Sequence, residues 1–208
     1  VENGIKIAED GLTTPGVVNG KNSANLLISD IDRIPSNEEI RNLRKIYNID
    51  FKAGDRILAA TERTDPAMFS NDILDMLKNN RDKIKALYII TKHDGLPIKR
   101  LLQDPTPKFI HFSITGLGDK IEPGVMKYND LLDKIGEYIK EGLDPNIITI
   151  RVDPLVPGLN IDGKTGEISD TVKHIIDKAL SIGITQFRTS MIDGYKSTVR
   201  DMKSVNYD

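Results

Sequence analysis

The sequence contains no cysteine and no tryptophan, and only 5% of its residues are aromatic. Without cysteine the chain can form no disulfide, offer no thiolate nucleophile and supply no thiolate ligand to zinc or to an iron–sulfur cluster. The charges also lack a bias of one sign, because 29 Lys and Arg residues are balanced by 31 Asp and Glu residues, for a net charge of −2. Such a balance creates no field that would attract the phosphate backbone of a nucleic acid.

Long apolar runs are absent as well. No segment approaches the ~20 apolar residues that a membrane-spanning helix needs, and no charged-then-apolar leader stands at the amino terminus. The chain is therefore expected to be a soluble, cytoplasmic protein. Its 208 residues suffice for one sizeable domain with its own core. The first residue is Val1 instead of Met, which predicts processing or a fragment.

A repeating pattern of short apolar runs and amphipathic stripes begins after residue 50. Residues 1–34 are rich in Gly, Asn, Ser and Thr and are expected to form an N-terminal arm, followed by a helix whose capping box is Ser36 and Glu39. The runs that predict strands are 56–61, 86–91, 109–115, 147–152 and 184–190. The stripes that predict helices are Ile40, Leu43, Ile46 and Tyr47; Phe69, Ile73, Met76 and Leu77; Leu131, Leu132, Ile135, Tyr138 and Ile139; and Val172, Ile175, Ile176, Ala179 and Leu180.

Strands that alternate with helices at this spacing are parallel and joined by right-handed crossovers. About five strands could form an open doubly wound sheet or most of a (β/α)8 barrel, which typically takes about 250 residues. Nearly every predicted strand ends in charged or hydroxyl residues, and in a barrel these ends converge on one mouth. We therefore favour an α/β fold of parallel (β/α) repeats forming a partial TIM-like barrel over residues 51–208, with an N-terminal arm and helix over residues 1–50.

Polar residues after the first two predicted strands are candidates for ligand binding. Arg63 follows the first strand, and a guanidinium there is suited to grip a carboxylate or a phosphate with two hydrogen bonds. Asp65 could bind a ligand or merely cap the next helix, with Pro66 in its first position. Lys92 follows the second strand and is either a binding cation or a solvated loop charge. His93 could act as an acid or base, but no pair of the three histidines has the spacing of metal ligands.

The third predicted strand is followed by Thr115, Gly116 and Gly118. Backbone N–H groups around these glycines could form a nest for an anion or for the carboxylate of a cofactor. Tight turns in a long connection explain the glycines equally well, because the segment matches neither GxGxxG nor a Walker loop. His111, inside this strand, is expected to be a buried and hydrogen-bonded residue.

The last two predicted strands carry the densest polar pattern. Arg151 and Asp153 alternate along the fourth strand, and Arg188 and Ser190 alternate along the fifth, so each pair is expected to face the barrel interior. Two interpretations stay open. The residues form either a network that holds the barrel together, since buried charges require partners, or a binding site for a small ligand.

Five short motifs occur in an order that resembles one family. They are Arg63-Thr64-Asp65-Pro66-Ala67; Thr91-Lys92; Phe112-Ser113-Ile114-Thr115-Gly116 with Gly118; Glu122-Pro123; and Arg151-x-Asp153-Pro154. Over residues 56–196 the chain resembles an uncharacterised domain family related to spore photoproduct lyase. The resemblance implies a radical-SAM-like barrel that binds S-adenosylmethionine and a [4Fe-4S] cluster, held by three cysteines late in the family's chains. It also implies that the barrel mouth is lined by Arg63, Asp65, Lys92, Thr115, Arg151 and Asp153.

The missing cysteines separate this chain from that chemistry. Without thiolates no site-differentiated cluster forms, and without the cluster S-adenosylmethionine is not cleaved reductively. The first hypothesis is a barrel domain that binds a small anionic or nucleotide-like ligand and is catalytic only if a cysteine-bearing segment or partner supplies the cluster. The ligand-binding residues would be Arg63, Asp65, Lys92, Thr115, Gly116, Arg151, Asp153, Arg188 and Ser190. No cofactor or metal is expected in this chain alone, and no catalytic residue is assigned.

Two alternatives to this hypothesis stay open. A non-catalytic structural or interaction protein could reuse the scaffold, because an incomplete barrel leaves a strand edge that favours self-association or pairing with a second chain. A lyase or aldolase-like enzyme could use Lys92 as an amine nucleophile, which requires a deprotonated amine. Barrel architecture alone does not decide among the three, since one fold can host many chemistries.

Overall fold

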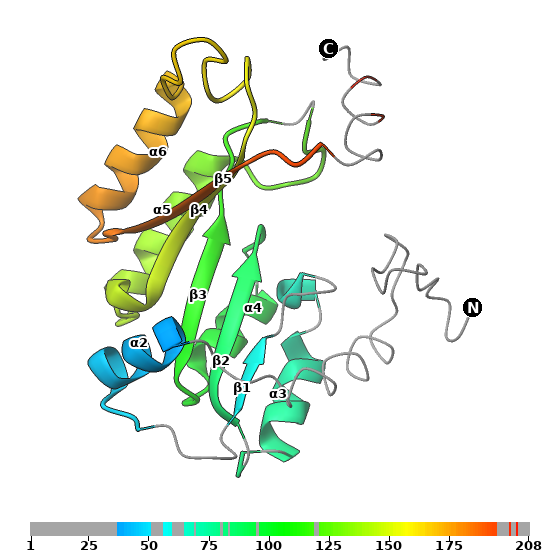
Figure 1. Cartoon of the computed structure of the whole chain (residues 1–208). Helices are drawn as coiled ribbons and strands as arrows, with labels where there is room; N and C mark the ends of the chain where they lie inside the picture. Colours follow the sequence, from blue (N-terminus) through cyan, green and yellow to red (C-terminus); the bar gives the residue numbers. More distant parts are fainter. Residues whose placement is uncertain are drawn as a thin grey trace. The chain divides into compact units, whose positions relative to one another are not determined.

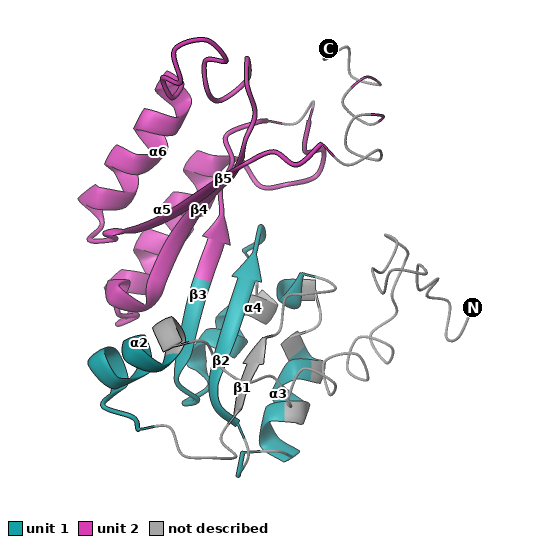
Figure 2. Ribbon diagram, in the orientation of Figure 1, with its two compact units in different colours: residues 1–110 teal, residues 111–208 magenta. Residues whose placement is uncertain are grey.

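In the computed structural model the chain forms two compact units, residues 1–110 and residues 111–208, which Figure 2 shows in different colours. The structure describes residues 37–50, 56–59, 65–68, 70–79, 81–82, 84–94, 96–118, 121–194, 200 and 203. The predicted arm over residues 1–34, the capping residue Ser36 and the candidate ligand residue Arg63 lie outside the described residues.

The first unit contains the helices α2 (Asn37–Tyr47), α3 (Ser70–Asn79) and α4 (Leu96–Gln103) and the 3-10 turn η1 (Pro66–Met68). Its strands are β1 (Arg56–Ala59), β2 (Ile84–Thr91) and the first half of β3 (Lys108–Ser113). β1 and β2 are parallel, and β3 is the other neighbour of β2. The predicted strands and the first two predicted helices are confirmed, whereas α4 was not predicted.

Both faces of β2 are covered by helices. Alternation along the strand places Ala86 on one face and Leu87 and Ile89 on the other. On the first face, Leu43 of α2 forms a buried cluster with Ala86 and with Phe109 of β3. α3 and α4 pack against each other and lie on the other side of the strands (Figure 1). β2 is thus buried from both sides, as expected of a strand inside a parallel sheet.

The carboxyl end of α2 is attached to β3 by a tyrosine. The Tyr47 hydroxyl accepts a hydrogen bond from the Lys108 N–H (3.0 Å) and donates one to the Lys108 carbonyl (2.5 Å). The helix ends directly after Tyr47, because Asn48 adopts a left-handed φ of 53° while its N–H still bonds to the Arg44 carbonyl (3.1 Å). The predicted stripe of Ile40, Leu43, Ile46 and Tyr47 therefore lies within this helix, up to its last residue.

The second unit contains the end of β3, α5 (Tyr128–Lys140), the 3-10 turn η2 (Pro145–Ile147), β4 (Ile148–Leu155), α6 (Asp170–Ser181) and β5 (Gln186–Met191). β4 and β5 are parallel, and β4 is also the neighbour of β3. Figure 1 shows α5 and α6 side by side on one face of β4 and β5. The apolar, buried positions of β4, which are Ile148, Ile150 and Val152, alternate with polar residues on the opposite face.

The α/β class with parallel strands and βα repeats is confirmed, while the closure of these strands into a partial barrel stays a prediction. One position of a predicted stripe is wrong: Leu180, near the end of α6, is 48% exposed. It lies one residue past the buried Ala179, at the edge of the apolar stripe instead of within it. None of the described helices is long and apolar enough to cross a membrane.

Candidate functional site

A polar face is formed in the second unit by β3, β4 and β5, on the side of the strands opposite α5 and α6. Its charged residues are Arg151 and Asp153 of β4 and Arg188 of β5, and the register of the two strands places Arg151 directly beside Arg188. Asp153 forms an ion pair with Arg151 and accepts a hydrogen bond from the Ser190 hydroxyl. The structure therefore brings together the four candidate residues that the alternation of the last two strands had indicated.

The two arginines of this face differ in their partners. The Arg151 and Asp153 side chains are largely buried, with 22% and 17% of their surface exposed. Arg188 is exposed, and it forms no ion pair with any residue that the structure describes. Because the two guanidiniums lie in register and Asp153 is the one carboxylate of this cluster, one positive charge of these residues is left without a matching negative charge.

His111 belongs to β3 and lies on the same polar face as the two arginines. Its side chain is buried, as predicted. Burial, together with the positive charges of Arg151 and Arg188, lowers the pKa of His111 from 6.5 to about 3. The imidazole is therefore neutral at physiological pH. The net charge of the four ionisable groups on this face is then one positive charge, which comes from the two arginines and Asp153.

A pocket of about 380 Å³ opens beyond the end of β3 in the same unit. It is lined by the connection from β3 to α5 and by the first turns of α5 and α6, including Thr115, Glu122, Tyr128 and Thr171. The Thr115 hydroxyl donates a hydrogen bond to the Glu122 carboxylate. Two candidate residues, Thr115 and Gly116, thus lie at this pocket, whose lining includes neither arginine of the polar face.

Gly116 is required by its surroundings. Its φ of +69° is a conformation that residues with a Cβ rarely adopt, and a Cβ at this position would come within 2.8 Å of Thr171 Cγ2. Gly118 has a similar φ of +74°, but no atom in the described part of the chain lies within 4 Å of the place that its Cβ would occupy. Close packing against α6 is therefore the structural reason for a glycine at position 116. From the sequence, a tight turn and an anion nest were the two explanations of this glycine.

A buried asparagine, which sequence reasoning missed, joins the ends of β3 and β4. Asn160 is 1% exposed. Its Nδ2 donates to the Thr115 carbonyl (3.0 Å) and to the Pro154 carbonyl (3.1 Å), and its Oδ1 accepts from the Val156 N–H (2.6 Å). A lone asparagine in a loop rich in Gly is typical of an ordinary turn, so the sequence carries no signal of this role.

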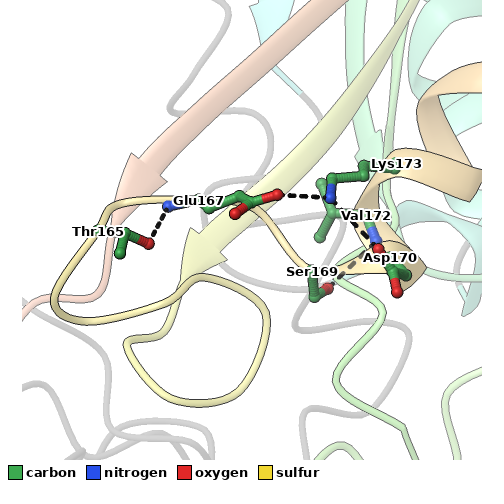
Figure 3. Close-up of polar contacts among 6 residues, drawn as sticks. All are labelled: Thr165, Glu167, Ser169, Asp170, Val172 and Lys173. Atoms are coloured by element: carbon green, nitrogen blue, oxygen red, sulfur yellow. Dashed lines mark hydrogen bonds and ion pairs between the residues drawn. The ribbon is translucent and has the colours of Figure 1, made fainter.

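The connection from β4 to α6 fixes the first turn of α6 (Figure 3). The Ser169 hydroxyl caps the helix by accepting from the backbone N–H three residues later (3.3 Å). Lys173 forms ion pairs with Glu167 (2.8 Å) and with Asp170 (3.3 Å). Ion pairs at such exposed positions contribute little stability, so the cap is the stronger constraint. These contacts hold Thr171 at the wall of the pocket.

Asp65 and Lys92 belong to the first unit. The Asp65 carboxylate accepts three hydrogen bonds, from the Thr91 hydroxyl (2.7 Å), the Lys92 N–H (2.8 Å) and the Ala67 N–H (2.9 Å). It therefore caps η1 and ties this turn to the end of β2. This arrangement favours the structural interpretation of Asp65, the cap, over its interpretation as a ligand residue.

Comparison with known proteins reveals a distant structural similarity. No family model and no curated protein matches the chain. A solved structure that is similar to it is that of a radical SAM methyltransferase from Sphaerobacter thermophilus, with a TM-score of 0.42 and 12% sequence identity. The match covers 85% of this chain and 59% of that chain. The link to spore photoproduct lyase and its relatives stays a prediction.

The residues of this chain do not fit an iron–sulfur cluster. Such clusters are held mainly by cysteine thiolates, and the 208 residues include no cysteine. Histidine and carboxylate ligands do not replace them, because in the part of the chain that the structure describes no group of three or more such residues is placed to hold a metal ion. These residues therefore supply no ligand set for the cluster.

Proposed function

We propose that the chain binds a small anion, a carboxylate or a phosphate, on the polar face of β4 and β5 within a radical-SAM-like βα domain. The observation that carries this proposal is the pair Arg151 and Arg188, which lie in register, while the one carboxylate of the cluster, Asp153, is ion-paired with Arg151. An anion beside the exposed Arg188 guanidinium would neutralise the remaining positive charge. It would also accept two parallel hydrogen bonds, the geometry that suits a guanidinium.

The neighbouring residues would prepare Arg188 for this task. Asp153 holds Arg151 through an ion pair and Ser190 through a hydrogen bond, so these two side chains are fixed before a ligand arrives. His111 stays neutral and adds no further positive charge below the arginines. A binding role of Arg63, Asp65, Lys92, Thr115 and Gly116 stays a prediction.

Radical chemistry would require components that these residues do not provide. A cysteine-bearing segment or a partner chain would have to supply the [4Fe-4S] cluster, and S-adenosylmethionine would then be its co-substrate. We infer that the present residues contribute the binding of the small anion to such an assembly. The division of the chain into an arm and helix over residues 1–50 and a barrel over residues 51–208 also stays a prediction.

Calorimetric titration with inorganic phosphate at constant ionic strength tests the proposal. The wild-type protein should show saturable binding, and Arg188→Gln should weaken it about tenfold or more, because hydrogen bonds to charged groups contribute about 1.5–3 kcal/mol. Arg41→Gln is the matched control, since it removes the same charge from an exposed position of α2. A phosphate affinity that falls equally in both variants would show that only the net charge matters and would contradict the proposal.

A second candidate function is self-association through β5, favoured by two exposed apolar side chains on this strand. Phe187 is 38% exposed and Met191 is 52% exposed, and β5 is the last strand in the order of the sheet. A second copy of the chain would cover them by pairing with the same strand edge. Light scattering should then detect a dimer that Met191→Lys abolishes, whereas a wild-type monomer at every concentration would contradict this candidate.

A further inference from the structure

We propose that the pocket beyond β3 binds an uncharged molecule that combines a planar ring with hydroxyl groups, as a nucleoside does. This inference goes beyond the binding of a small anion at Arg188, since the pocket has its own lining and the opposite charge. It stands on three properties of the pocket, which are its size and apolar wall, its arrangement of hydrogen-bond donors and acceptors, and its balance of charges.

The size and the walls of the pocket suit a small organic molecule. Its volume of about 380 Å³ falls within the range of ligand sites, roughly 300–1,000 Å³. Ile114 and Leu131 are buried and form an apolar wall, and Tyr128, at the start of α5, adds an aromatic ring to the lining. An apolar wall next to an aromatic side chain favours a ligand with a planar ring over an open-chain polyol, because a ring that stacks there buries apolar area of the ligand and of the pocket.

Hydroxyl groups match the polar groups of the pocket. Thr115 and Glu122 offer acceptor oxygens, since a hydroxyl has two lone pairs and the two oxygens of a carboxylate have about four. The first turn of α5 offers donors, because the early N–H groups of a helix have no partner within it and the side chain of the preceding Lys127 does not cap them. A hydroxyl both donates and accepts, so one ligand hydroxyl can serve each kind of group.

The charges of the lining disfavour an anion. Glu122 and Asp130 contribute two carboxylates, whereas Lys127 contributes the one cation among the described lining residues. Of the two carboxylates, Glu122 is half-buried and is hydrogen-bonded to Thr115, so it keeps its place within the pocket. A phosphate brought into this lining would meet a net negative charge, and we therefore infer a nucleoside instead of a nucleotide.

The walls of the pocket are fixed by contacts within the second unit. Asn160 holds the carbonyl of Thr115, the Ser169 cap holds the first turn of α6, and Gly116 packs against Thr171 of that turn. A ligand that enters a preformed pocket does not have to order these loops, which reduces the entropic cost of binding.

Ligand-observed NMR with adenosine and uridine, followed by calorimetric titration, tests this inference. Saturable binding to the wild-type protein is expected at millimolar concentration or below. Thr115→Val removes the hydroxyl with little change of shape, and Glu122→Gln removes the charge at constant size. Each should weaken adenosine binding about tenfold, while Glu137→Gln, an exposed position on α5, should leave it unchanged.

Two comparisons separate this site from the arginine pair. Arg188→Gln should leave adenosine binding unchanged, and in that background AMP should bind at least about tenfold more weakly than adenosine because of its phosphate. Absence of saturable binding of both nucleosides to the wild-type protein would overturn the inference, as would equal binding of AMP and adenosine. Binding that neither Thr115→Val nor Glu122→Gln weakens would also overturn it, and circular dichroism would establish that both variants are folded.

Discussion

Replacing Asn160 by alanine should strongly destabilise the fold. The change removes one acceptor and one amide group that donates twice, and it leaves the Val156 N–H and the carbonyls of Thr115 and Pro154 without these partners. Asn160 is 1% exposed, so water cannot replace the lost hydrogen bonds without opening the loops. The substitution therefore acts through buried polar groups that become unsatisfied.

The size of the effect follows from the number of groups affected. A buried polar group that loses its partner costs about 1–3 kcal/mol, although a carbonyl can keep a second partner and then costs less. For one N–H and two carbonyls we expect a decrease in the free energy of unfolding of about 3–5 kcal/mol. Asn160→Asp should cost at least as much, because a carboxylate would face the carbonyl oxygens of Thr115 and Pro154.

Urea denaturation followed by circular dichroism measures this effect. Asn146→Ala is the matched control, since the side chain of Asn146 is exposed and, among the residues that the structure describes, bonds only to the nearby Asp144 (2.8 Å). It should change the free energy of unfolding by no more than about 0.5 kcal/mol. If Asn160→Ala costs no more than Asn146→Ala, the conclusion that Asn160 joins the ends of β3 and β4 is wrong.

Two further predictions concern His111 and the glycines of the pocket. Because the folded state lowers the pKa of His111 to about 3, its contribution to stability is present above pH 6.5 and is lost as the pH falls toward 3. Urea unfolding should show wild-type stability falling relative to His111→Gln by up to about 1.4 kcal/mol per pH unit in this range; parallel curves would refute this. Gly116→Ala and Gly118→Ala both place alanine at positive φ, but only the first brings a Cβ within 2.8 Å of Thr171. Gly116→Ala should therefore cost about 1–2 kcal/mol more in thermal unfolding, and equal costs would argue against the close contact.

The strands and most helices could be predicted because their signals are local. Runs of apolar residues predicted β1 to β5. The prediction ended β4 at Val152, because an aspartate and a proline usually end an apolar run, but the strand continues through Asp153 and Pro154 to Leu155. The missed helix was α4, which begins at Leu96 next to Pro97. A proline in the first turn is compatible with a helix, since the N–H that it lacks would have no partner there.

The polar face was predictable for the same reason, whereas the pocket was not. Alternation along a strand is a property of the backbone, so the sequence of β4 alone predicts that Arg151 and Asp153 lie on one face. This prediction does not depend on which residues of β5 are their neighbours. The hydrogen bond between Asn160 and Thr115 joins residues 45 positions apart, and no local pattern carries such information. The same limit applies to Thr115 and Glu122, whose contact depends on the course of the connection from β3 to α5.

The two proposed sites therefore rest on different physical foundations and can fail independently. The arginine pair depends on strand register, which the many backbone hydrogen bonds of β4 and β5 maintain, so Arg188→Gln should change charge without moving the loops. The pocket depends on loops that a few buried contacts hold, so Asn160→Ala should weaken nucleoside binding while phosphate binding persists in the molecules that stay folded. Parallel loss of both activities would mean instead that the second unit carries a single site spanning the ends of β3, β4 and β5.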